Sequence, residues 1–315
     1  MVLTMRRYCI IIFLLWLTVS CGKTHLLKEL IQIDTYPSAS GIEYYSDRIY
    51  LIGDDARQLL ILDSNLHIQD SILLYPGNDK RLSKDTKPDL ESIARIRITG
   101  KNQLLIIGSG SLAPYRNAAW LINPENAQKQ AISLDTFFLR LPFNGIQETN
   151  IEGSCAIPGS IVLSNRGNKT NRKNQLIITS NNFWMQQAVA PISTLLVGSN
   201  ADTTVFNGVS GLAYATKSDR LVMTVSTEDT RNAYDDGAIG KSYLWIVKNI
   251  SGKKRWKSVN PDQVIDLEAI DPRFKGQKIE SVCITNETKH FLHLVLAADN
   301  DKGSSTLFRI LIEKK

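Results

Sequence analysis

The feature that most constrains the fold is a repeat that occurs five times along the chain. Each copy begins with Ser or Glu, continues with Gly or Ser, and then gives a short strand, a tight turn and a more apolar strand. A polar loop and a third apolar run follow. The copies start at Ser40, Glu91, Glu152, Ser210 and Glu280. Because the apolar runs are short and no long period of 3.6 residues interrupts them, the repeat indicates an all-β fold.

The length of the repeat favours a β-propeller, whose four-stranded blades commonly take about 40–50 residues each. The first four copies also show a fourth apolar run, at residues 68–75, 130–141, 192–198 and 262–270. The fifth copy ends at Lys315 with three strands, and an unmatched run, "LLKELIQID" (26–34), stands at the other end of the chain. Pairing this run into the last blade would close the ring and remove its open edges. We therefore predict one five-bladed propeller of four-stranded antiparallel blades over residues 26–315, with six blades as the alternative.

The N-terminus is typical of an exported protein. Arg6 and Arg7 precede an apolar run over residues 9–19, which is short for a membrane span and fits a secretory signal peptide. The run ends in "LTVSC", which is similar to a bacterial lipoprotein box. We expect a signal peptide over residues 1–20 and a lipidated linker over residues 21–25, acylated at Cys21. The lipid, palmitate among its chains, would then hold the protein to a cell-envelope membrane, the outer membrane by preference. An ordinary signal peptide or an uncleaved anchor is the alternative.

Charge and cysteine content exclude some classes of function. A formal net charge of +6 on 315 residues gives no argument for nucleic-acid binding. Cys155 and Cys283 fall at the same place in two copies of the repeat, two copies apart, so we expect separate buried thiols rather than a disulfide. We also expect a monomer.

The first residue of every repeat is polar although it opens a buried strand. In a propeller the first strand of each blade lines the axis, so these five residues are predicted to converge there. Three carboxylates at one point would raise one another's pKa, and protonation, a ring of water or a bound hard cation would relieve the repulsion. Oxygen ligands suit calcium, and the lack of His or Cys among them argues against zinc or copper. The expected metal ligands are Ser40, Glu91, Glu152, Ser210 and Glu280.

With these residues in view, the chain resembles the soluble calcium-activated nucleotidases of the apyrase type. In that family of five-bladed propellers a ring in the order Ser, Glu, Glu, Ser, Glu holds a central calcium. Residues 54–57 (DDAR) resemble the family's Asp-Asp-Arg turn, 152–156 (EGSCA) its Glu-Ser-Ala-Cys strand, and 226–229 (STED) its Ser-Glu-Glu-Asp loop. Residues 164–166 (SNR) have one arginine where the family has two, and "GSGS" (108–111) lacks the aromatic that follows it there. Phytase-like propellers of exported bacterial proteins are similar in their blade starts.

The long polar loops between second and third strands should emerge on one face, and this loop face is the expected binding surface. Acidic groups beside arginine suit a metal-bridged phosphate, whereas solvated loops with local ion pairs are the alternative. The predicted ligand-binding residues are Asp54, Asp55, Arg57, Arg166, Glu228, Asp229 and Asp299, with Asp301 nearby.

Two functions remain open at this point, and no catalytic residue is assigned. We favour an exported, lipid-anchored propeller whose loop face binds a phosphorylated small molecule or a protein. The alternative is a calcium-dependent hydrolase of phosphate esters or anhydrides, as the resemblance implies.

Overall fold

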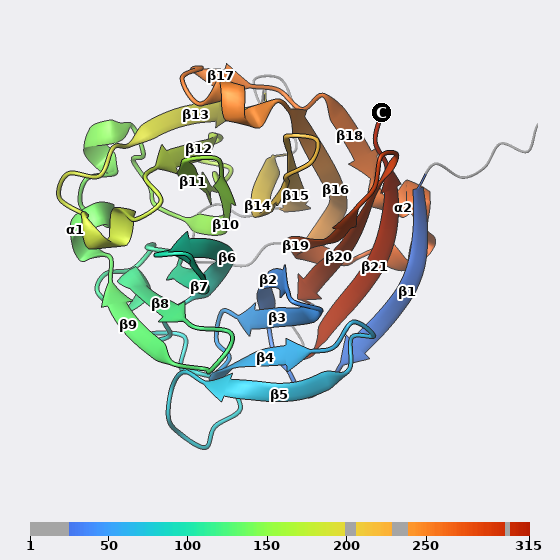
Figure 1. Ribbon diagram of the computed structural model, residues 1–315, viewed down its shortest axis with the longest axis horizontal. Helices are drawn as coiled ribbons and strands as arrows, with labels where there is room; N and C mark the ends of the chain where they lie inside the picture. The colour runs from blue at the N-terminus through green and yellow to red at the C-terminus, as the bar shows by residue number, and fades with distance from the viewer. Residues whose placement is uncertain (1–24, 199–205, 229–238, 300–302) are drawn as a thin grey trace, which may run out of the picture.

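The computed structural model describes residues 25–198, 206–228, 239–299 and 303–315. In this part of the chain five small sheets of antiparallel strands stand in a ring around a common axis (Figure 1). The prediction of a five-bladed, all-β propeller is therefore confirmed, and the six-bladed alternative is wrong for the described residues.

Each blade runs outward from the axis in the order of its strands. The first blade contains β2 (Ala39–Tyr45), β3 (Arg48–Gly53), β4 (Gln58–Leu62) and β5 (Ile68–Leu73). The second contains β6 (Leu90–Ile98), β7 (Lys101–Gly108), β8 (Ala118–Ile122) and β9 (Lys129–Ser133). The third contains β10 (Ile151–Ile157), β11 (Ser160–Asn165), β12 (Asn174–Thr179) and β13 (Ser193–Val197). The fourth contains β14 (Asn207–Ala215), β15 (Arg220–Glu228), β16 (Ile239–Lys248) and β18 (Gln263–Asp266).

The last blade is completed by the N-terminal strand. It contains β19 (Lys278–Glu287), β20 (Phe291–Asp299) and β21 (Ser305–Glu313), and β1 (His25–Ile33) pairs antiparallel with β21 as its outer strand. In Figure 1 the blue β1 lies beside the red β21. Glu29 of β1 stands opposite Arg309 of β21 and forms an ion pair with it at 3.0 Å. The predicted closure of the ring is confirmed.

Two of the predicted fourth strands are shorter than expected because they turn into helices. The run at 130–141 gives β9 and then α1 (Asp135–Phe138), whose Phe137 and Phe138 enter the core between the second and third blades. The run at 262–270 gives β18 and then α2 (Leu267–Ile270), which Asp266 begins by accepting a hydrogen bond from the Glu268 amide.

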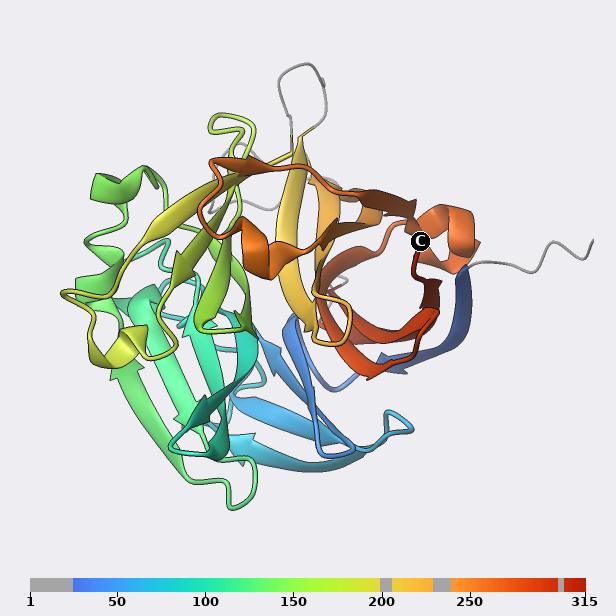
Figure 2. The same cartoon turned by 45° about the horizontal axis from the view of Figure 1, so that its top comes forward.

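The remaining elements are short 3₁₀ helices and one added strand. They are η1 (Tyr115–Asn117), η2 (Pro142–Asn144), η3 (Phe183–Met185), η4 (Ile250–Lys253), η5 (Pro272–Phe274) and β17 (Ser258–Val259), which pairs parallel with β13. The tilted view of Figure 2 shows α1 and α2 outside the ring of inner strands.

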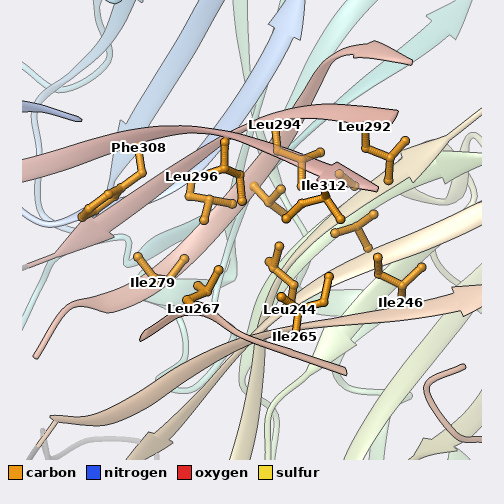
Figure 3. Close-up of a cluster of buried hydrophobic side chains, with 14 of the residues drawn as sticks. Leu244, Ile246, Ile265, Leu267, Ile279, Leu292, Leu294, Leu296, Phe308 and Ile312 are labelled. Carbon is orange, nitrogen blue, oxygen red and sulfur yellow. The ribbon is translucent and has the colours of Figure 1, made fainter. Parts of the chain in front are cut away.

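Apolar side chains fill the wedges between neighbouring blades. The cluster between the fourth and fifth blades, drawn in Figure 3, joins Leu244 and Ile246 of β16 to Leu294 and Leu296 of β20. Phe274 of η5 stacks on Phe308 of β21 with ring centroids 4.5 Å apart. These contacts bury the apolar face that each strand pattern predicts, and they fix how far the blades stand from the axis.

Small residues at the second position of the repeat let the innermost strands approach one another. A Cβ on Gly153 would lie 2.5 Å from the Ser210 carbonyl oxygen, and one on Gly211 would lie 2.6 Å from the Ser281 Cα. Hydroxyls join the blades at the same level, because Ser40 Oγ donates to the Leu90 carbonyl and Thr224 Oγ1 to the Glu280 carbonyl. The Gly or Ser of the repeat is therefore required by packing at the axis.

Cys155 and Cys283 are buried free thiols, as predicted. Burial, with a contribution from Glu43, raises the pKa of both. No helix among the described residues is long and apolar enough to cross a membrane. The predicted signal peptide, and Cys21 with it, lies outside the described residues.

Candidate functional site

The innermost strands β2, β6, β10, β14 and β19 contact one another around the axis, and their first repeat residues lie at the loop-face end. Ser40, Ser210 and Glu280 are buried there, whereas Glu91 and Glu152 are half-buried. We name these five residues the axial ring. They were predicted as metal ligands, and that assignment stays a prediction.

Two of the three ring glutamates are held by basic side chains. Glu280 Oε1 lies 2.8 Å from Lys278 Nζ, and its Oε2 lies 3.8 Å from Arg166 Nη1. Burial would raise the pKa of Glu280, but Lys278 and Arg166 outweigh burial and lower it. Glu152 accepts a hydrogen bond from Asn150 Nδ2 at 2.7 Å and lies 3.6 Å from Arg166 Nη1. Arg166 therefore bridges two carboxylates of the ring.

Arg166 reaches the axis because Gly208 of the neighbouring blade leaves space for its guanidinium group. A Cβ on Gly208 would lie 2.3 Å from Arg166 Nε, so any side chain at Gly208 would force the guanidinium aside. Arg166 Nη2 also donates to Ser226 Oγ at 3.1 Å, which fixes the guanidinium between the third and fourth blades.

Glu91 differs from the other two glutamates, since its carboxyl group forms no hydrogen bond or ion pair of its own with the described residues. Burial raises its pKa well above the ordinary value, and the nearby Asp89, Glu152 and Asp54 add to the effect. Oxygens of Asp54, Asp89 and Glu91 lie within 4.8 Å of one another, a grouping that can hold a metal ion. This acidic triad shares Glu91 with the axial ring.

Basic side chains also enter the triad. Lys87 forms ion pairs with Asp54 and, at 2.7 Å, with Asp89 Oδ1, while Arg116 Nη1 and Ser109 Oγ contact Asp89 Oδ2. Burial raises the pKa of Asp54 to about 6, although Lys87 opposes the shift and Asp55 and Asp89 support it. Both oxygens of Asp89 are thus engaged, whereas Asp54 Oδ1 is buried without a hydrogen-bond partner.

Counted with every group ionised, the axis carries nearly balanced charge, and the raised pKa values of Glu91 and Asp54 favour protonation, which would reduce the negative charge further. Five carboxylates (Asp54, Asp89, Glu91, Glu152 and Glu280) face four cations (Lys87, Arg116, Arg166 and Lys278), which leaves one negative charge. The sequence argument counted only the glutamates and therefore overestimated the repulsion.

Some of the predicted ligand-binding residues of the loop face lie at this axis, and others form contacts elsewhere. Asp54 and Arg166 join the axial groups. Asp55 pairs with Arg81, and Arg57 donates to the Pro76 and Asp79 carbonyls, so both hold the loop that follows β5. Asp299 ends β20, and its charge acts on Arg81. Glu228 is the last residue of β15, and Asp229 and Asp301 lie outside the described residues.

Sequence reasoning missed Lys87, Asp89, Arg116 and Lys278. Asp89 and Lys278 stand two residues before the first repeat position, where the other blades have Ser38, Asn150 and Gly208. Extending the repeat alignment by two residues would have shown this mixed polar column. Lys87 and Arg116 come from loops of differing length, where the repeat gives no alignment.

Comparison with known proteins gives the family. A family model described as a family of unknown function, DUF6929, matches residues 35–312. The chain belongs to this family. No curated protein matches the chain. The DUF6929 model carries no activity, so the resemblance to calcium-activated nucleotidases stays a prediction.

One solved structure supports the fold of this DUF6929 member, and two others superpose more weakly. Myxococcus xanthus glutaminyl cyclase superposes with a TM-score of 0.53 at 10% identity, covering 92% of this chain and 97% of that one. A member of the DUF4221 family from Bacteroides vulgatus gives 0.43 at 8% identity, covering 92% and 98%. An exported protein of Bacteroides fragilis gives 0.45 at 8% identity, covering 94% and 98%. At 10% identity, the similarity to the glutaminyl cyclase concerns the fold alone.

Proposed function

We propose that this protein is a ligand-binding propeller organised around one hard divalent cation, calcium by preference, held by the axial ring. The observation that carries the proposal is a set of oxygens without hydrogen-bond partners at the ring. Among the described residues, Glu280 Oε2 and Ser210 Oγ are buried and accept or donate no hydrogen bond, although Arg166 lies 3.8 Å from Glu280 Oε2. The Ser210 hydroxyl helps to lower the pKa of Glu280, but the pair lacks hydrogen-bond geometry. Together with the unpaired Glu91 carboxyl, these oxygens are the ligand type that calcium prefers.

The residues present fit such a cation better at the ring than at the acidic triad. Both oxygens of Asp89 are already taken by Lys87, Arg116 and Ser109. At the ring, by contrast, Glu280 Oε2 and Ser210 Oγ have no hydrogen-bond partner among the described residues. A calcium ion there would change the axial charge from one negative to one positive. Such a centre suits an anionic ligand, and a phosphorylated small molecule at the loop face is the class that we propose.

We rank binding ahead of phosphate hydrolysis. Asp55 and Arg57, which the sequence analysis predicted as ligand-binding residues for a metal-bridged phosphate, are occupied by Arg81 and by loop carbonyls. We also propose that the protein is exported and anchored by a lipid at Cys21, which membrane fractionation of a Cys21→Ser variant tests.

Calorimetry of chelator-treated protein tests the cation. At a calcium concentration of about one hundred times Kd, binding to the folded state adds about 2.7 kcal/mol to the free energy of unfolding. We expect a higher Tm with calcium, and little effect of magnesium because it demands tighter octahedral geometry. Glu280→Gln should abolish the calcium response, whereas Asp89→Asn should retain it.

The outcomes separate the possible sites and functions. Loss of the response in Asp89→Asn with retention in Glu280→Gln would move the cation to the triad. Indifference of the parent protein to calcium would overturn the proposal and leave a ring neutralised by Arg166, Lys278 and a proton. Phosphate release from a panel of nucleotides and inositol phosphates, present with calcium and absent with chelator, would establish the hydrolase instead.

A further inference from the structure

A cavity lies at the end of the axis opposite the axial ring, on the face of the short turns between first and second strands. Its volume is about 270 Å³, and the innermost strand of every blade contributes to its wall. The wall includes Glu43 of β2, Arg95 of β6, Cys155 of β10, Tyr214 of β14 and Val282 of β19. We name it the turn-face cavity. Its volume is slightly below the range of drug-sized pockets, so its ligand would be small.

Both apolar and charged side chains line this cavity. Leu212, Ala213 and Val282 line it together with Tyr44 and Tyr214, and its two carboxyl groups are those of Glu43 and Glu287. The Tyr44 hydroxyl donates to Asp47 and the Tyr214 hydroxyl to Asp219, so both hydroxyl groups are already bonded. The exposed Thr216, Lys217 and Asn286 add polar groups at the surface. Apolar surface beside a few placed polar groups suits a small ligand that has both characters.

Glu43 places a fixed carboxylate in the wall of the cavity. Its Oε1 accepts the Tyr44 amide at 2.9 Å and its Oε2 the Arg95 amide at 2.8 Å, so two backbone donors fix the carboxylate. Burial raises the pKa of Glu43, although Arg95 and the amide bonds oppose the shift. A cationic ligand would offset the cost of that burial.

The charged groups around the cavity differ in their partners. The Arg95 guanidinium lies over the Tyr45 ring, 5.8 Å from its centroid, and Lys217 Nζ donates to the Glu287 carbonyl at 2.7 Å. The Glu287 carboxylate is paired with Lys314. Among the described residues the Glu43 carboxylate has two backbone amides as hydrogen-bond partners and forms no ion pair, although the charge of Arg95 acts on it. Glu43 is therefore the carboxylate of this cavity that a ligand cation would pair with.

We propose that the turn-face cavity binds a small organic cation, a primary ammonium group with a short apolar body. The ammonium pairs with Glu43, and the apolar body packs among Leu212, Val282 and the tyrosine rings. This site is separate from the loop-face function proposed above and does not depend on it.

Isothermal calorimetry with n-butylammonium chloride at pH 7 tests the proposal, with 1-butanol, sodium butyrate and sodium chloride as comparison solutes. We expect saturable binding of n-butylammonium, binding of 1-butanol at least tenfold weaker, and none of butyrate. Glu43→Gln should weaken n-butylammonium binding at least tenfold. Glu125→Gln, which removes an exposed carboxylate near Tyr45, is the matched control and should bind as the parent does.

A second variant keeps the test valid if Glu43→Gln does not fold. Ala156→Phe places a ring in the cavity from β10 and should abolish binding of n-butylammonium while the chain keeps its β-rich circular dichroism. Equal affinity for n-butylammonium and 1-butanol, or unchanged binding in Glu43→Gln or Ala156→Phe, would overturn the proposal. Because the calcium test uses another ligand and other residues, failure of one proposal leaves the other measurable.

Discussion

At the scale of single residues, the arrangement of charges at the axis depends on a glycine that has no side chain. Arg166 spans two ring glutamates because Gly208 leaves room for its guanidinium. A buried carboxylate without a cationic partner is costly, so Gly208 of the fourth blade contributes to the stability of Glu152 and Glu280 by leaving room for Arg166.

Gly208→Ala should therefore lower the free energy of unfolding by about 1–3 kcal/mol, through steric displacement of Arg166. Gly252→Ala is the control, because a Cβ there meets no atom within 4 Å. In an Arg166→Gln background the cost of Gly208→Ala should shrink, which a double-mutant cycle from urea denaturation measures. If Gly208→Ala lowers the free energy of unfolding equally in both backgrounds, the role of Gly208 does not depend on Arg166.

At the scale of elements, the sequence predicted what the repeat encodes and failed where other contacts decide. The inner three strands of each blade follow from apolar runs separated by turns. The runs at 130–141 and 262–270 were expected to be strands throughout, but Phe137 and Phe138 enter an inter-blade core as α1 and Asp266 caps α2. The ring residues were found by alignment, whereas Lys87 and Arg116 come from loops whose path depends on tertiary contacts.

Ion pairs at the turn face also join elements of different blades, and one of them gives a pH prediction. Glu287, at the end of β19, pairs with Lys314 after β21 at 3.1 Å and accepts the Lys217 amide of the fourth blade. Burial would raise the pKa of Glu287, but the Ser218, Lys217 and Lys314 contacts outweigh burial and lower it below 4.5.

A lowered folded-state pKa means that the ionised Glu287 stabilises the fold at neutral pH. This contribution is lost as pH falls through the folded-state value. Glu287→Gln should cost about 2 kcal/mol at pH 7, and the difference from the parent should shrink below about pH 4. Denaturant unfolding at several pH values between 3 and 7 measures this difference in the free energy of unfolding, with Glu125→Gln as the control. A difference that does not vary with pH would show that Glu287 contributes through packing only.

At the scale of the whole molecule, the ring is closed by two strands from opposite ends of the chain. β1 pairs along β21 from His25↔Ile312 to Ile33↔Ser305, with Leu27 in the core between the fourth and fifth blades. Closure covers the outer edge of β21 and ties the N-terminal strand to the C-terminal blade.

Deleting residues 25–33 should therefore affect the whole molecule rather than one strand. The deletion exposes the backbone of β21 and uncovers apolar side chains around Phe308, so we expect a lower Tm and aggregation measurable by light scattering. Supplying the peptide HLLKELIQI in trans should restore part of the lost Tm by pairing with β21, whereas a scrambled peptide should not. If the truncated chain melts like the parent, β1 is an accessory strand and the ring is stable with four complete blades and one of three strands.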